Sequence, residues 1–410
     1  MPTVRIHPLR ALLAAASVLA AVGAWTGGAT AAPVQAFLAT LAPAQANEFA
    51  AWRAAKTRYD QQLDAYWAEI EKKRAGRRAK RGSTKFFDTS DYVWSFPPTY
   101  QGPRLSAELD RAWARFLAAQ EQSTAQPAKE KKELPGLADF LAAARKHYGF
   151  EPMRITEREF KRRYAEQAIS LGLTKEQVVR VYALETGGDG TADMQAGINP
   201  ITKKGKPISS ALGYAQLLHA NTIGELVKHG DMFIKRLQRL QASTSDPARA
   251  AELHRKIAAL QAMMRSAKSV PDDWYRHVAF AQTSKGYGIH AINLDGDIGP
   301  WLQSQKLRGL KDSAGRKGVT NLSGEELEIM NLSGPSTGLE MMQPVGLTAP
   351  TPNFFARRAY YVNKMVIGKT SAELLAEFTR RMDASSRKAG AVEFAAAFDE
   401  ARQDEKLPWR

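Results

Sequence analysis

Glu185 is the residue of this 410-residue chain whose type and position best suit acid/base chemistry. It stands near the end of a predicted helix that begins at Lys175, because Thr174 and Gln177 have capping-box spacing and apolar residues then cover more than one face. Gly187 can take the left-handed conformation that ends a helix. Burial and the negative end of the helix dipole both disfavour a carboxylate, so we expect the raised pKa that a general acid needs. The alternative is a glutamate that only ends a helix and faces water.

A pattern of residues follows Glu185. Glu185-Thr186 leads into a polar loop, then into the run Gly213-Tyr214-Ala215-Gln216, and soon afterwards to Asn221-Thr222. This order resembles that of lytic transglycosylases and goose-type lysozymes, in which a helix ends in Glu-Ser and a loop or small β-hairpin precedes a Gly-Leu-Met-Gln-like helix start. The resemblance covers about residues 140–300. Thr186 replaces the usual Ser, and the Ala-Tyr-Asn-Ala-Gly motif of that superfamily has only a poor counterpart, at 279–282.

The resemblance implies a mainly α, lysozyme-like core with a small β-hairpin, and an enzyme that cleaves cell-wall glycan. The hairpin would have 198–202 and 207–209 as arms and 203–206 as its turn. Glu185 would protonate the glycosidic oxygen and then act as a base, while the N-acetyl group of the substrate assists and a 1,6-anhydro sugar forms. Candidate substrate-binding residues are Thr186, Tyr214, Gln216, Asn221, Gln282 and Tyr287.

Gln282 and Tyr287 are included for a further reason. They lie in a stretch, 271–310, that is dense in aromatic and amide side chains, which typically line sugar-binding clefts. The same stretch holds Asp295-Gly296-Asp297, half of a calcium ligand set, but it lacks the closing glutamate of an EF-hand. The histidines show no zinc-binding spacing, and no P-loop or G-x-G-x-x-G occurs. We therefore expect no metal, no cofactor and no nucleotide.

Two further carboxylates, Asp189 and Asp193, follow Glu185 closely. A retaining or inverting glycosidase uses a second carboxylate as nucleophile or base, and these two are the nearest in sequence. The single-acid mechanism implied by the resemblance needs neither. The alternative for each is a residue that caps a loop.

The first 31 residues have the pattern of a secretory signal. A positive start precedes an apolar run that is short for a membrane span, and Ala29-Thr30-Ala31 suits cleavage after Ala31. The rival is an uncleaved N-terminal anchor. The chain has no cysteine, which excludes a lipoprotein anchor, a disulfide and a thiolate site. We expect an exported, periplasmic protein.

Composition divides the rest of the chain. The predicted regions are a helical N-terminal region at 32–120, a linker at 121–134, the core at 135–310 and a helical C-terminal region at 311–410. The N-terminal region contains a strongly basic run, 71–81, interpreted as a solvated helix end in preference to an anion-binding surface. It also contains an aromatic and proline-rich segment, 92–103, interpreted as packing across its own domain in preference to binding ligand.

The net charge is +16 and the isoelectric point is near 9.8, so the chain is expected to be attracted to polyanions. Three hypotheses follow. The first is a peptidoglycan-cleaving enzyme of the lytic transglycosylase type. The second is a non-catalytic peptidoglycan-binding or envelope scaffold protein with a degenerate lysozyme-like fold. The third, an exported nucleic-acid-binding protein, depends on charge alone, and the signal and the lack of a nucleic-acid motif count against it.

Overall fold

The computed structural model of the protein describes residues 31–81, 86–124 and 133–405. Helix accounts for 68% of the structure and strand for 2%, so the predicted mainly α class is confirmed. The predicted signal, apart from Ala31, lies outside the described residues. None of the helices in the described part is long and apolar enough to cross a membrane.

The described residues form two compact units. The first unit comprises 134–347 and 371–405, and the second comprises the described residues up to 133 together with 348–370. The division at 133/134 falls at the end of the segment predicted as a linker, of which 125–132 lie outside the described residues. Each unit is considered by itself.

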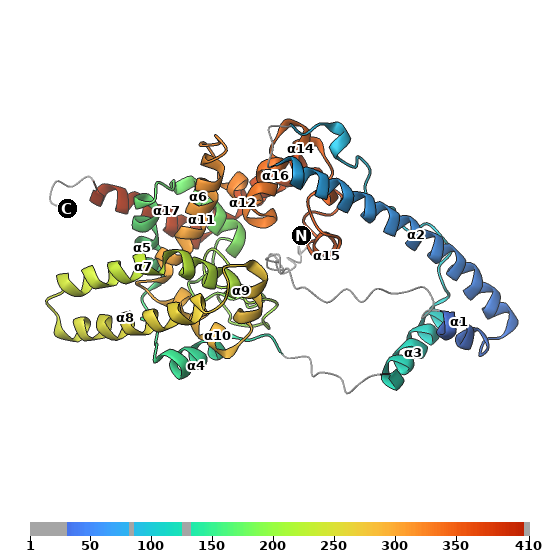
Figure 1. Ribbon diagram of the computed structural model, residues 1–410, viewed down its shortest axis with the longest axis horizontal. Coiled ribbons are helices and arrows are strands. Elements are labelled where there is room, and N and C mark those ends of the chain that lie inside the picture. Colours follow the sequence, from blue (N-terminus) through green and yellow to red (C-terminus); the bar gives the residue numbers. More distant parts are fainter. Residues whose placement is uncertain (1–30, 82–85, 125–132, 406–410) are drawn as a thin grey trace, which may run out of the picture. The chain divides into compact units, whose positions relative to one another are not determined.

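The first unit is built from helices of very different lengths (Figure 1). They are α4 (Leu137–Tyr148), α5 (Glu157–Ser170), α6 (Lys175–Thr186), α7 (His219–Ser243), α8 (Pro247–Lys268), α9 (Trp274–Ala281), α10 (Ser284–His290), η2 (Ala291–Leu294), α11 (Gly299–Gly315), α12 (Gly324–Ser333), α13 (Pro335–Met341), α14 (Pro344–Thr348, at the unit's boundary), α16 (Ser371–Ser385) and α17 (Ala389–Glu405).

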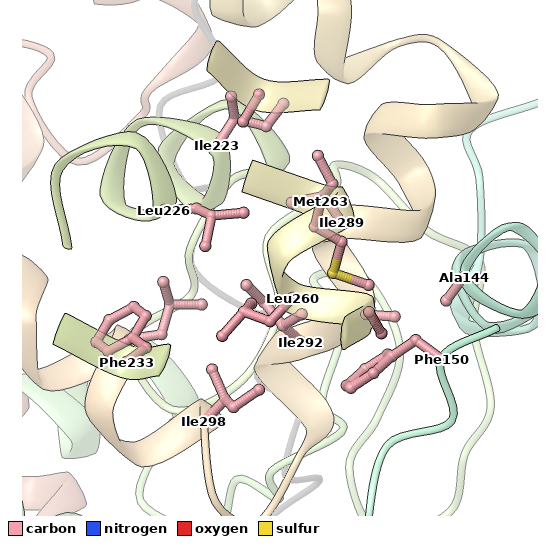
Figure 2. Close-up of a cluster of buried hydrophobic side chains, with 14 of the residues drawn as sticks. Ala144, Phe150, Ile223, Leu226, Phe233, Leu260, Met263, Ile289, Ile292 and Ile298 are labelled. Carbon is pink, nitrogen blue, oxygen red and sulfur yellow. The ribbon is translucent and has the colours of Figure 1, made fainter. Parts of the chain in front are cut away.

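The apolar core of this unit forms around α7 and α8, which lie side by side (Figure 1). Figure 2 shows Leu226 and Phe233 of α7 close to Leu260 and Met263 of α8, with Ile292 of η2 beside them. These side chains are fully buried, and burying each one contributes about 1.5–3 kcal/mol. The core fixes the directions of α7 and α11, which later supply charged side chains to the candidate site.

Local sequence signals account for α6. Thr174 Oγ1 accepts from the Gln177 amide at 3.1 Å, and the Gln177 side chain accepts from the Thr174 amide at 3.0 Å. Gly187 follows in the left-handed conformation, with φ 69°. The predicted start at Lys175 and the glycine stop are both confirmed.

The segment 189–218 differs from its prediction. The described residues contain an isolated bridge between Ile198 and Gly205 in place of the paired arms 198–202 and 207–209. The reason is local, because the Asn199 side chain accepts from the amides of Ile201 and Thr202 and bends the first arm into a turn. The segment is a stack of turns, not a hairpin of strands.

The second unit contains α1 (Ala31–Leu38), α2 (Pro43–Lys80), η1 (Thr89–Asp91), α3 (Ala107–Thr124), η3 (Thr351–Asn353) and α15 (Arg357–Val362). Arg77, from the basic run, is buried here and stacks on the Tyr92 ring at 4.6 Å. Asn353 holds the backbone of Val93 through two hydrogen bonds, of 2.7 and 2.8 Å. The start of the aromatic and proline-rich segment thus packs against its own unit.

Candidate functional site

Glu185 lies in the last turn of α6 and is half-buried. Its Oε1 accepts a hydrogen bond from Asn331 Nδ2 at 3.1 Å. Burial raises the pKa of Glu185 to about 7, although hydrogen bonds from Glu328 and Asn331 and the charge of Lys306 act in the opposite direction. A carboxyl group with this pKa can both give and take a proton near neutral pH.

Glu328 and Asn331 reach Glu185 from α12. They are three residues apart, so they lie on one face of the helix, and a capping box of Ser323 and Glu326 fixes where that helix begins. Glu328 is only 5% exposed, and its carboxyl meets that of Glu185 at the Asn331 amide. Burial, followed by the charge of Glu185, raises the pKa of Glu328 well above its ordinary range.

Lys306 of α11 supplies the nearest positive charge. Burial lowers its pKa, while the charges of Glu225, Glu328 and Glu185 raise it and Lys228 lowers it. No hydrogen bond or ion pair joins Lys306 to another residue in the described part of the chain. Its ammonium group therefore interacts with the carboxyls across a gap and not through direct contact.

The α7 side of the site carries Glu225, which is 8% exposed and lies 3.9 Å from Lys228 and 3.5 Å from His229. Asn221 precedes Glu225 by four residues and so lies on the same face of α7. Glu225 is a charged neighbour of Lys306. Asn221 is therefore the predicted substrate-binding residue that shares a helix face with a group of the candidate site.

Three other predicted substrate-binding residues make internal hydrogen bonds. Thr186 Oγ1 donates to the Tyr182 carbonyl at 2.6 Å. Tyr214 is 1% exposed and donates to Glu157 Oε2 at 2.5 Å. Gln216 is buried, and its amide donates to the Gly213 carbonyl at 2.7 Å. These three polar groups shape the turns after α6.

The remaining two predicted substrate-binding residues lie on α10 and at the end of α9. Gln282 is exposed as the C-cap residue of α9. Tyr287 of α10 is half-buried and stacks against His219, with ring centres 6.4 Å apart. Neither contacts Glu185 in the described part of the chain.

The two candidate second carboxylates, Asp189 and Asp193, interact with other described residues and not with Glu185. Asp189 accepts from the Gly390 amide at 3.3 Å. Asp193 lies 3.0 Å from Lys203 and 3.1 Å from Arg154. Burial raises the pKa of Asp193, but its hydrogen bonds and these two cations hold it below its ordinary value. The carboxyl group that does meet Glu185 is Glu328.

The Asp295-Gly296-Asp297 turn surrounds a cation that belongs to the chain itself. Lys256 Nζ lies 2.9 Å from Asp295 and 2.5 Å from Asp297. Arg249 adds a second ion pair to Asp297 at 2.7 Å. Within the described ranges, no group of three histidine or acidic side chains is placed to hold a metal ion.

Sequence reasoning missed Glu328, Asn331 and Lys306. The capping box at Ser323 marks the helix that carries two of them. No local pattern says which face of that helix meets Glu185, more than 140 positions away in the sequence.

No protein-family model matches this chain, and comparisons with curated proteins and with solved structures give no match.

Proposed function

We propose that this chain is an exported enzyme that cleaves the glycan strands of peptidoglycan, with Glu185 as its general acid/base. The observation that carries the proposal is the half-buried Glu185 at the end of a buried helix, with a carboxyl pKa of about 7. A lysozyme-like arrangement of the core belongs to the proposal, in which the turns at 189–218 form one lip of the cleft.

The reaction needs two proton transfers through the same carboxyl group. Glu185 gives its proton to the glycosidic oxygen, the bond from that oxygen to the sugar C1 breaks, and the leaving sugar departs as an alcohol. The Glu185 carboxylate then takes a proton from the attacking hydroxyl. If that hydroxyl is the 6-OH of the same sugar, an anhydro product forms; if it is water, a reducing end forms.

Charge supports the choice of substrate. The chain carries a net charge of +16, and the bacterial cell wall is a polyanion, so long-range attraction favours their encounter. This attraction is screened by salt. Binding to isolated walls should therefore weaken as ionic strength rises.

The test compares the mature protein with its Glu185→Gln variant. Each would digest purified peptidoglycan, and mass spectrometry would identify the soluble products. Glu151→Gln is the matched control, because Glu151 is an exposed glutamate paired with Arg145. Anhydro-sugar products from the parent and the control, but not from Glu185→Gln, are expected. Equal product release by Glu185→Gln would refute the role of Glu185.

A second candidate function is a peptidoglycan-binding scaffold without catalysis. The observation that favours it is the internal use of Thr186, Tyr214 and Gln216, which leaves fewer groups for a sugar. Wall binding by the parent protein with no released sugar, at any pH between about 5 and 8, would support this function over the first.

A further inference from the structure

Glu185 and Glu328 come from different helices and meet over one amide group. Asn331 Nδ2 lies 3.1 Å from Glu185 Oε1 and 3.4 Å from Glu328 Oε2, so one amide group brings the two carboxyls together. α12 packs against both α6 and α11 (Figure 1). Two carboxylates held this close in an enclosed site repel each other, and retaining one proton between them relieves that repulsion.

The positive charge near Glu185 and Glu328 is enough to balance one negative charge on the two carboxyls. Lys306 is the cation that interacts with both glutamates, although the charge of Glu225 on α7 acts on it more strongly than either of them. On the α7 side, Glu225 is accompanied by its own neighbours, Lys228 and His229. One shared proton and one ammonium group would make the pair and Lys306 neutral together, which suits an enclosed site.

The other charged groups near α6 have partners of their own. Arg180, on another side of α6, lies 3.2 Å from Glu325 of α12 and 2.6 Å from Asp383 of α16. Glu176 at the start of α6 pairs with the same arginine at 3.2 Å. These groups form a separate set at the opposite end of the helix, and none of them contacts the Glu185 carboxyl.

We propose that Glu328 is a positioning residue that shares one proton with Glu185, so that the two side chains act as a single acid/base unit balanced by Lys306. Glu328 keeps the shared proton and donates its hydrogen bond to Glu185. Glu185, the more accessible member, gives and regains the second proton. Asn331 holds both carboxyls in place. The function of Glu328 as an aid to catalysis rests on the proposed function, whereas the sharing of the proton does not.

The division of roles follows from access. Glu328 is 5% exposed, whereas Glu185 is half-buried, so Glu185 is assigned as the member of the pair that meets the substrate oxygen. A buried proton donor beside it stabilises the carboxylate that forms after each proton transfer. Such a pair titrates in two steps that belong to both groups.

The experiment is a titration of the full chain labelled with ¹³C at the glutamate carboxyl carbon. Signals are assigned by loss in Glu185→Gln and Glu328→Gln. In the parent protein we expect one carboxyl to titrate at about 7 and a second to titrate higher. Glu328→Gln should keep the step near 7, because the amide donates the same hydrogen bond. Glu328→Met cannot donate, so the pKa of Glu185 should rise.

Two results would overturn the proposal. One is a Glu328 signal that titrates near 4.5, the ordinary value of a glutamate. The other is an equal Glu185 pKa in the Gln and Met variants. If either substitution at 328 prevents folding, Glu185→Gln still decides: removal of the like charge should lower the Glu328 pKa, and no change would refute the coupling.

The same proteins separate this proposal from the proposed function. Suppose that the two carboxyls titrate as described but the protein releases no sugar from peptidoglycan. The proposed enzymatic function would then be refuted, and the sharing of a proton would stand. If sugar release depends on Glu185 but Glu328 titrates near its ordinary value, the sharing of a proton would be refuted and the enzymatic function would stand. A pH–activity profile of Glu328→Gln that keeps the limb near pH 7 would support both.

Discussion

Replacing Glu185 by glutamine should stabilise the protein at high pH and leave its stability unchanged at low pH. Burial holds the pKa of Glu185 at about 7, above the ordinary value of 4.5. A carboxyl whose pKa is raised by folding contributes stability that is fully present below its unfolded pKa. This contribution is lost as pH rises through the folded pKa. The window for Glu185 therefore extends from about 4.5 to about 7.

The magnitude follows from the same two values. Each pKa unit corresponds to about 1.4 kcal/mol, so ionising Glu185 in the folded protein costs about 3 kcal/mol more than in the unfolded chain. The full amount is an upper limit, because the variant also leaves Lys306 without the charge of Glu185. We expect Glu185→Gln to raise the free energy of unfolding at pH 8 by about 1–3 kcal/mol.

The assay is urea unfolding of parent and variant at pH 4 and pH 8, followed by tryptophan fluorescence and by circular dichroism. Glu151→Gln is again the control, because its exposed ion pair should contribute less than about 1 kcal/mol at either pH. A stability difference between parent and Glu185→Gln that is the same at both pH values would refute the reasoning. It would show that Glu185 ionises in the folded protein as it does in the unfolded chain.

Three further substitutions test the structure that supports the site. Gly188→Ala should lower the free energy of unfolding by about 2–4 kcal/mol, because this residue has φ +84° and an added Cβ would lie 2.1 Å from the Ser385 carbonyl oxygen. Thermal unfolding measures the loss. Lys256→Met should lower the free energy of unfolding by about 3–5 kcal/mol, because it leaves the buried Asp295 and Asp297 with too little positive charge. Urea unfolding measures this loss. Tyr214→Phe should cost about 1–2 kcal/mol by removing the bond to Glu157, with cell-wall cleavage unchanged.

Matched controls make these outcomes decisive. Gly149 also has a positive φ, but an added Cβ would meet nothing within 4 Å, so Gly149→Ala should cost less than the change at 188. Lys268 is a surface lysine paired with Asp231, and Lys268→Met should change stability little. A large loss of cleavage in a stable Tyr214→Phe would restore the substrate-binding role first predicted for that residue.

Signals close together in the sequence predicted helix ends well. The capping box at Thr174 and the stop at Gly187 are both formed. These features depend on contacts within a few residues, which is why they can be read from a single chain. The same kind of local reasoning predicted the rise in the pKa of Glu185, because a largely apolar helix is expected to be buried.

Contacts between distant segments could not be predicted. The meeting of Glu185 with Glu328 depends on how α6 and α12 pack, and Lys256 enters the Asp-Gly-Asp turn from a different helix. Tyr214 illustrates the opposite error of reasoning: an aromatic residue in a glycine-containing loop suggested a sugar contact, yet packing encloses it. The hairpin failed for a local reason that the sequence did contain, the turn-forming side chain of Asn199.

The central claim is that Glu185 is the acid/base of a peptidoglycan-cleaving enzyme. The most direct measurement is the rate of sugar release from purified peptidoglycan by the parent and by Glu185→Gln, from about pH 5 to about pH 9. The account predicts that the rate of the parent falls as pH rises through about 7, and that the variant binds walls yet releases no sugar at any pH. A variant that releases sugar at the parental rate, or a parent whose rate does not change through this range, would contradict it.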